Sequence, residues 1–262
     1  MAQDSHDSEY NDAMVAVLEW LWGRDFMAPG GAGNIEKMLR GIETRDREIL
    51  DIGSGLGGPA FLLSRDYQAE VTGIDIEPHL LARARQRAQE LNLQRPVIFE
   101  QVSPGPLPFE DRSFDIVFSS GAITQVDDKS GMFLECARVL RPGGYLTVYD
   151  WLKAEGDYSP DMMYFFEMEG LTYSLATLEE TRKVVQKAGF DEVSVEDASD
   201  WYRVKSRSEY EQLKREFDRI ERLIGTHDAN HMLGNWRALV VVCEQGELRQ
   251  AYTRARKPAE PG

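Results

Sequence analysis

A glycine-rich turn after a short apolar run most restricts what this chain can fold into. The run Glu48 to Ile52 is apolar and β-branched, as in a buried strand, and Gly53, Gly55 and Gly58 follow it with the spacing G-x-G-x-x-G. In such a unit, glycine lets the backbone approach a ligand at the N-terminus of the next helix. The turn predicts an α/β domain that binds a nucleotide-like cofactor, with a turn that holds no ligand as the alternative.

Two carboxylates beside this turn narrow the choice of ligand. Asp51 precedes the first glycine by two residues, and Asp75 lies near the end of the next apolar run, Glu70 to Ile76, where it can accept ribose hydroxyls. A carboxylate at Asp51 repels a pyrophosphate but suits a cofactor with an ammonium group and no phosphate. S-adenosyl-L-methionine is such a cofactor, so we predict it here, with a nicotinamide dehydrogenase as the weaker alternative.

The first 150 residues alternate between strand and helix patterns. The expected strands are Glu48 to Ile52, Glu70 to Ile76, Val97 to Val102, Phe114 to Ser119 and Tyr145 to Tyr149, and the expected helices are Pro59 to Asp66, Glu77 to Leu91 and Lys129 to Leu140. This alternation predicts a doubly wound, mostly parallel Rossmann-like sheet.

The second half completes this sheet less regularly. We expect a helix over Leu178 to Ala188, a strand over Glu192 to Glu196, a long charged helix over Ser206 to Ile224, and a last, central strand over Ala238 to Glu244. The predicted segments are an N-terminal lid helix (1–30), a cofactor-binding core (31–156), a small inserted cap (157–177), the completion of the sheet (178–252) and a flexible tail (253–262). A surface helix packed on the sheet is an equal alternative for the cap.

Charge and cysteine content bear on partners and location. The chain has 45 acidic and 30 basic residues, a formal net charge of −15, so nucleic acid and anionic membranes are not expected partners. We find neither an apolar run of about 20 residues, as a membrane span requires, nor a signal peptide. Cys136 and Cys243 are expected to be reduced core residues. We expect a cytoplasmic monomer or homodimer that acts on a small molecule.

Four motifs together resemble the class I S-adenosylmethionine-dependent methyltransferases. They are Leu50 to Gly58, Gly73 to Ile76, Phe114 to Val117 and Arg138 to Gly144, and the resemblance extends from about Tyr10 to the end of the chain. Within that class, the stretch Trp20 to Gly31 resembles phosphoethanolamine N-methyltransferases. The glycine, sarcosine and dimethylglycine methyltransferases are similar at a greater distance.

The resemblance implies roles for individual residues. The implied cofactor-binding residues are Met27, Ala28, Asp51, Gly53, Gly55, Asp75, Ile76, Ser103 and Ser119. Asp75 would accept the ribose hydroxyls, Ile76 would pack on the adenine, and Ser103 stands where relatives place an aspartate for the adenine amino group. Tyr10 matches an active-site tyrosine on the lid, and would orient the nucleophile with help from Gln125.

The chain departs from these families where they bind and deprotonate the substrate. Gly121 replaces an acidic residue and Gln125 replaces a histidine, and a glutamine cannot take a proton. Leu171 stands at the position of a phosphate-binding arginine, and Trp151 at that of a tyrosine, while Tyr173 matches. We predict substrate binding by Trp20, Trp151 and Tyr173, with nearby carboxylates favouring a cation. The alternative is that these aromatic residues belong to the core.

The histidines add little to this interpretation. His227 and His231 are spaced i, i+4, but no third ligand is evident, so we expect a solvated helix start and no metal. We predict S-adenosylmethionine-dependent methylation of a small polar metabolite, with nitrogen of an amine or amino acid as the favoured acceptor. S-, O- or C-methylation and a non-catalytic cofactor-binding regulator remain alternatives.

Overall fold

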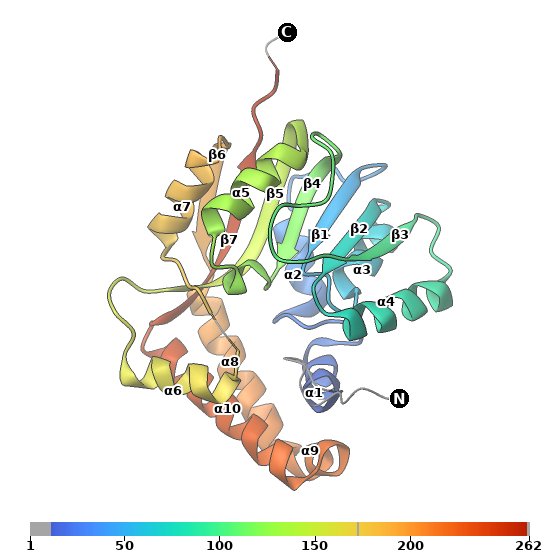
Figure 1. Cartoon of the computed structure of the whole chain (residues 1–262). Helices are drawn as coiled ribbons and strands as arrows, with labels where there is room; N and C mark the ends of the chain where they lie inside the picture. Colours follow the sequence, from blue (N-terminus) through green and yellow to red (C-terminus); the bar gives the residue numbers. More distant parts are fainter. Residues whose placement is uncertain (1–11, 172, 261–262) are drawn as a thin grey trace.

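The computed structural model describes residues 12–171 and 173–260. Its centre is a seven-stranded sheet in the order β3-β2-β1-β4-β5-β7-β6 (Figure 1). The strands are β1 (Glu48–Ile52), β2 (Glu70–Asp75), β3 (Val97–Gln101), β4 (Phe114–Ser120), β5 (Leu140–Lys153), β6 (Asp191–Asp197) and β7 (Leu248–Arg256). The first five pair in parallel, and β7 runs antiparallel to both β5 and β6. The predicted mostly parallel, Rossmann-like sheet is confirmed.

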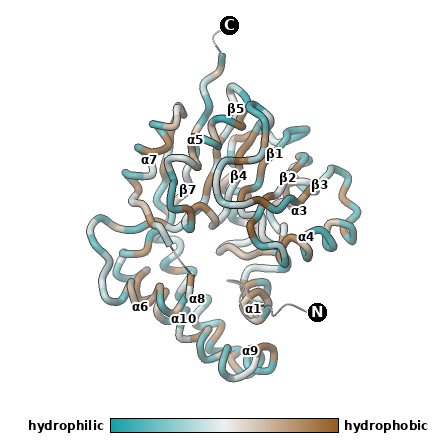
Figure 2. Tube along the Cα trace, in the orientation of Figure 1, coloured by the Kyte–Doolittle hydropathy of each residue, from teal (hydrophilic) through white to brown (hydrophobic). Residues whose placement is uncertain are grey.

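Helices cover both faces of this sheet because alternate residues of each strand point to opposite faces. On one face Ile49 packs with residues of α2 (Gly31–Met38), α3 (Gly58–Tyr67) and α4 (Pro78–Leu91). On the other face Leu50 packs with residues of α5 (Lys129–Val139) and α7 (Leu178–Lys187). Figure 2 shows hydrophobic residues along the central strands and hydrophilic residues on outer turns of the helices.

A second helical layer lies together at one end of the sheet (Figure 1). It consists of α1 (Asp12–Trp22), α6 (Pro160–Glu169), α8 (Ser199–Arg215), α9 (Phe217–Ile224) and α10 (Thr226–Glu244). These helices share one apolar cluster, which includes Leu18, Phe165, Tyr202 and Trp236. The predicted lid and cap are therefore parts of one helical assembly.

The expected last strand over Ala238 to Glu244 is wrong. These residues form the end of α10, and the last strand is β7, which begins at Leu248. A short apolar run fits a buried helix as well as a strand, and here the helix continues the pattern that begins at Thr226. The expected helix over Ser206 to Ile224 is two helices, α8 and α9, which meet at Glu216.

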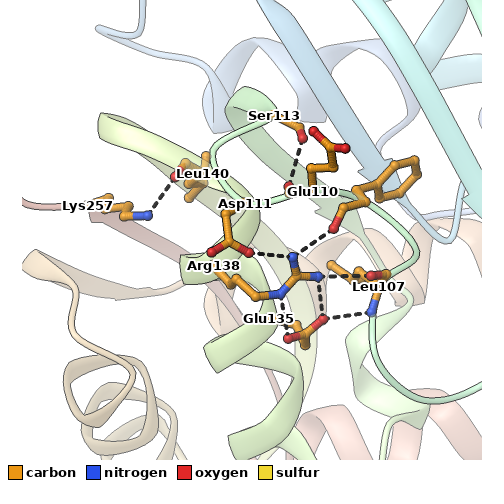
Figure 3. Close-up of polar contacts among 9 residues, drawn as sticks. Leu107, Glu110, Asp111, Ser113, Glu135, Arg138, Leu140 and Lys257 are labelled. Atoms are coloured by element: carbon orange, nitrogen blue, oxygen red, sulfur yellow. Dashed lines mark hydrogen bonds and ion pairs between the residues drawn. The ribbon is translucent and has the colours of Figure 1, made fainter.

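The C-terminal residues also differ from the expectation of a flexible tail over 253–262. Thr253 to Arg256 belong to β7 and pair with β5. Beyond the strand, the Lys257 ammonium donates to the carbonyl of Leu140 at 2.6 Å (Figure 3). The sheet thus extends four residues past the predicted boundary.

Arg138, in the last of the four motifs, holds the long loop between β3 and β4 against α5. Its guanidinium donates to the carbonyls of Leu107 and Phe109 and pairs with Glu135 and Asp111 (Figure 3). Charge-assisted hydrogen bonds from one guanidinium fix several loop atoms at once. Arg138 therefore has a structural role at a distance from the glycine turn.

Both cysteines of the chain, Cys136 and Cys243, are buried and unbridged. Among the described residues, no helix is both long and apolar enough to cross a membrane.

Candidate functional site

The glycine turn at the end of β1 has a backbone that other residues adopt only with strain. Gly53 and Gly55 have φ values of +72° and +51°, in the left-handed region. The amides of Gly53 and Ser54 both donate to the carbonyl of Ile74 on β2, at 2.8 and 3.0 Å. A Cβ on Gly53 would lie 2.1 Å from the Cβ of Ala122. The turn is therefore fixed against β2 and has no room for a side chain at Gly53.

Asp75 closes one side of this turn. Its carboxylate accepts hydrogen bonds from the amides of Gly55, at 2.8 Å, and Glu77, at 3.0 Å. Each carboxylate oxygen can accept more than one hydrogen bond, so this fixed group is suited to receive the two hydroxyls of a ribose. Ile76, 47% exposed, stands beside it with an apolar surface available to an adenine ring. Ser103 is exposed in the loop that follows β3.

Asp51 is the most unusual carboxylate of the turn. It is only 1% exposed, and its Oδ2 has no hydrogen-bond partner among the described residues. Burial, and then the negative charge of Asp75, raise the pKa of Asp51 to about 8. A buried acceptor without a donor is costly, and an ammonium group would satisfy it. The residues of this turn thus fit the amino group and the ribose of S-adenosylmethionine.

The segment that follows α1 packs against the glycine turn. A Cβ placed on Gly55 would lie 3.0 Å from the sulfur of Met27, and a Cβ on Gly121 would lie 3.5 Å from the Cβ of Ala28. Met27 therefore lies against the turn, and Ala28 lies against the loop that follows β4. The hydroxyl of Ser119 is buried and donates to the carbonyl of Ile52 at 2.9 Å, so it joins β4 to β1. Tyr10 lies outside the described residues.

A cavity lies between the ends of β4 and β5 and the helical layer. Together with the open solvent at its mouth, the cavity spans about 690 Å³. Its lining comprises Met14, Leu18, Trp22, Met27, Ala28, Pro29, Gly121, Thr124, Gln125, Tyr149, Asp150, Trp151, Glu169, Leu171, Tyr173, Tyr202, Trp236 and Leu239. The structure thus gathers Met27, Ala28, Gln125, Trp151 and Tyr173 around one space.

Trp20 is not part of that lining. Its ring is half-buried in the helical layer, with the guanidinium of Arg219 5.9 Å from the ring centre. The tryptophan of α1 that lines the cavity is Trp22, two residues further along the helix. Residues two positions apart on a helix point in different directions, so only one of these two tryptophans can contribute to the cavity.

The cavity wall is aromatic and acidic. The rings of Trp151 and Tyr173 lie 5.4 Å apart, and those of Trp22 and Trp236 lie 6.2 Å apart. The lining includes two carboxyl groups and no arginine, lysine or histidine among the described residues. Leu171 occupies part of the wall where the related families place an arginine. An anionic substrate would find no cation here, whereas an ammonium group would meet carboxylates and aromatic faces.

The two carboxyl groups of the wall have different environments. Glu169 accepts hydrogen bonds from the hydroxyl of Tyr173, at 3.1 Å, and from the amide of Asn235, and burial raises its pKa. Asp150 is 7% exposed, and burial raises its pKa to about 7 although the charge of Lys129 opposes this shift. Glu169 is thus held by other side chains, while Asp150 is held by the backbone.

One residue that the sequence did not single out orients two of the tryptophans. Glu209 on α8 is 1% exposed and accepts hydrogen bonds from the indole nitrogens of Trp22, at 2.7 Å, and Trp236, at 3.3 Å. In the sequence it is one of many acidic residues in a charged helix. The available signal was its spacing from Tyr202 and Leu213, which places the three residues on one face of the helix, the inner one.

No metal centre is evident in the described part of the chain. Its histidine, cysteine, aspartate and glutamate residues form no group of three or more that could hold an ion. His227 and His231 are exposed in the first two turns of α10.

Comparisons with known proteins agree with this geometry. Residues 50–148 match the family model described as a methyltransferase domain. Phosphoethanolamine N-methyltransferase 3 of Arabidopsis thaliana is 24% identical over 95% of this chain and 50% of its own length. The chain thus spans about half the length of this curated relative. The predicted resemblance to phosphoethanolamine N-methyltransferases is confirmed.

Two further comparisons bear on the fold and on substrates. The 27-O-demethylrifamycin SV methyltransferase of Amycolatopsis mediterranei is 29% identical over 94% of this chain and 95% of its own length. Phosphoethanolamine N-methyltransferase 2 of Haemonchus contortus, solved with phosphomonomethylethanolamine and S-adenosylhomocysteine, superposes with a TM-score of 0.89 at 24% identity, over 96% of this chain and 59% of that one. This chain therefore contains a methyltransferase domain at residues 50–148, built on the fold of class I S-adenosylmethionine-dependent methyltransferases.

Proposed function

We propose that this chain is an S-adenosylmethionine-dependent methyltransferase that methylates the nitrogen of a small amine. The observation that carries the cofactor assignment is the buried, unpartnered carboxylate oxygen of Asp51 at the glycine turn. The fixed carboxylate of Asp75 supports it, as do the cofactors named with the Haemonchus structures.

The chain's own residues can bring the reactants together. Bound at the turn, the cofactor would supply a sulfonium methyl group for in-line displacement by a nucleophile. The aromatic wall offers an apolar surface to the substrate, and the amide of Gln125 can orient a polar substrate group without taking a proton. Alignment of two reactants can lower a barrier by about 7 to 11 kcal/mol. The sequence-predicted role of Tyr10 in orienting the nucleophile remains part of this proposal.

The cavity supports an amine without a phosphate as the substrate. The Arabidopsis and Haemonchus relatives are named for phosphoethanolamine. In this chain Leu171 lines the wall, and the described lining offers no cationic side chain to bind a phosphate. We expect the chain to act on this amine as a monomer or homodimer. The net charge of −15 argues against a nucleic-acid partner.

Transfer of a labelled methyl group tests the proposal. The purified chain is given S-adenosylmethionine with a labelled methyl group and a panel of amines, amino acids, phosphoethanolamine, alcohols and thiols, and products are identified by mass spectrometry. We expect labelled N-methyl product from amines, and Asp51→Asn to weaken S-adenosylhomocysteine binding about ten-fold or more, as loss of a buried ion pair does. The control Glu100→Gln, which removes an exposed charge from β3, should leave binding unchanged.

A second acceptor is supported by one relative. The Amycolatopsis enzyme, named for an O-methylation, matches nearly the whole of both chains, and the apolar part of the cavity wall suits a larger hydroxylated substrate. Labelled product from alcohols alone would favour that function. Cofactor binding without any product would favour the non-catalytic regulator instead.

A further inference from the structure

One carboxyl group lies beside the position where the related families carry an acidic residue. That position is Gly121, just after β4. The register of β4 and β5 pairs Ser120 with Tyr149, and the amide of Gly121 donates to the carbonyl of Tyr149 at 2.8 Å. Asp150, the next residue on β5, is therefore adjacent to Gly121, and both line the cavity. A carboxylate from β5 thus lies next to the position, just after β4, at which this chain has Gly121 in place of an acidic residue.

Among the described residues, the carboxylate of Asp150 has no ion-pair partner. Its carboxylate accepts hydrogen bonds from the backbone amides of Trp151, at 3.2 Å, and Thr124. The ammonium of Lys129 donates to the carbonyls of Ile123 and Val126, at 2.8 and 2.9 Å, and acts on Asp150 only through space. On the other side, the β7 residue paired with Asp150 is Ala251, which carries no charge.

The other polar groups of the wall are less suited to receive a proton. Glu169 of α6 already accepts a hydrogen bond on each carboxylate oxygen, from Tyr173 and Asn235. Gln125 has no titratable group. Burial raises the pKa values of Tyr149 and of Tyr202 on α8 well above the usual tyrosine value, so neither phenol ionises near neutral pH.

We propose that Asp150 binds the ammonium form of the substrate amine and takes one proton from it, so that the nitrogen lone pair becomes free to attack the methyl group. This inference rests on the proposed N-methyltransferase function and names the group that replaces the missing histidine and the missing acidic residue. Asp150 is then a catalytic residue of the substrate side, separate from the cofactor turn.

The step balances in protons and electrons. The ammonium nitrogen gives a proton to the Asp150 carboxylate and keeps the pair of electrons. As that pair forms the nitrogen–carbon bond, the methyl–sulfur bond breaks and its electrons go to sulfur, which becomes a neutral thioether. The product is a methylated ammonium ion, and the protonated Asp150 returns its proton to solvent when the product leaves.

The acidity of Asp150 agrees with that role. Burial raises its pKa to about 7, and the positive charge of Lys129 limits the rise. A general base works best when its pKa lies near the working pH. An ammonium group beside the carboxylate favours its charged form, so substrate binding would itself keep Asp150 ready to accept the proton.

Binding of two matched probes tests the inference. Phenethylamine, an ammonium ion at pH 7, and the neutral 2-phenylethanol are titrated into protein saturated with S-adenosylhomocysteine, and tryptophan fluorescence is recorded. In Asp150→Asn we expect phenethylamine to bind about ten-fold or more weakly, as expected for loss of a charge-assisted hydrogen bond, and 2-phenylethanol to be affected by less than about two-fold. The control Asp127→Asn removes an exposed charge near Lys129 and should affect neither probe.

Two results would overturn the inference. One is a wild-type protein that does not bind phenethylamine more tightly than 2-phenylethanol, and the other is an Asp150→Asn variant that binds the amine as the wild type does. For any amine methylated by the wild type, the variant's rate should approach the wild-type rate as pH rises above the pKa of that amine. Failure of the proposed function would give a different result: no labelled N-methyl product would form from any amine, although S-adenosylhomocysteine binds.

Discussion

The two ends of the proposed active centre, a cofactor end at the glycine turn and a substrate end at the cavity, are built in different ways. The cofactor end comes from one strand, one turn and the end of the neighbouring strand, with Asp51, Gly53 and Asp75 within 25 residues of sequence. The substrate end is assembled from α1, β5, α6, α8 and α10, which are far apart in the sequence. Local sequence therefore specifies the first end, whereas tertiary packing specifies the second.

Their electrostatics are alike despite this difference. Each end holds one buried carboxylate that no described side chain pairs with, Asp51 at the turn and Asp150 at the cavity. A buried charge without a partner destabilises a fold unless a ligand or a proton neutralises it. Both positions are therefore where positive groups of the reactants are expected to bind.

The largest effect should come from the turn itself. Gly53→Ala would place a Cβ 2.1 Å from the Cβ of Ala122 at a backbone φ of +72°, so either the turn or the loop after β4 must move. We expect S-adenosylhomocysteine affinity to fall about 100-fold, because a small misplacement of binding groups is costly. Calorimetric titration measures this. Gly33→Ala is the control, since it sits in α2 with nothing within 4 Å, and normal binding by Gly53→Ala would show that the turn does not hold the cofactor.

This contrast explains what could be predicted from the sequence. The glycine turn, Asp51 and Asp75 were predicted because spacing and charge within a short stretch carry the signal. The roles of Met27 and Ala28 came from the family resemblance; in the structure Met27 lies beside Gly55 of the turn and Ala28 beside Gly121. The assignment of Asp51 to a cofactor ammonium group stays a prediction until binding is measured.

Apart from the C-terminal residues that extend β7, the errors lie in the helical layer. Ala238 to Glu244 was predicted as a strand because a short apolar run has the same composition in a buried helix. Trp20 was predicted to bind the substrate, yet Trp22 lines the cavity, because the rotation of α1 relative to the sheet is not encoded in its own residues. Glu209 was missed since only the folded chain brings its carboxylate to Trp22 and Trp236.

A middle-sized effect should come from Glu209, which tests whether the substrate end depends on long-range packing. Glu209→Gln removes the charge that pairs with Lys205 at 3.5 Å and keeps one carbonyl acceptor for two indole donors, so one tryptophan of the wall loses its partner. We expect phenethylamine to bind about five-fold more weakly, the scale of one lost hydrogen bond, with S-adenosylhomocysteine affinity unchanged. The control Glu211→Gln removes an exposed carboxylate of the same helix, paired with Lys214. Equal losses at both ends would contradict their independence.

The smallest effect concerns the pH dependence of stability without ligand. The pKa of Asp51 is raised from 3.8 to about 8 in the folded chain, so the folded state binds this proton more tightly than the unfolded state. Linkage then requires stability to fall as pH rises between these two values. Asp150, Glu169 and Glu209 shift in the same direction, so only the difference between Asp51→Asn and the wild type isolates Asp51.

Between pH 7.5 and pH 8.5 we expect the stability of Asp51→Asn relative to the wild type to rise by about 1 kcal/mol or less, because folding takes up about half a proton at Asp51 over this interval and a full proton would contribute about 1.4 kcal/mol per pH unit. Urea unfolding at both pH values measures this. Saturating S-adenosylhomocysteine, whose ammonium group would pair with Asp51, should remove the pH dependence that Asp51 contributes to the wild type. The contrary result is a stability difference between the wild type and Asp51→Asn that does not change with pH, with or without this ligand. It would mean that Asp51 is charged and paired in the free protein. The cofactor end would then differ from the substrate end in its electrostatics as well as in its construction.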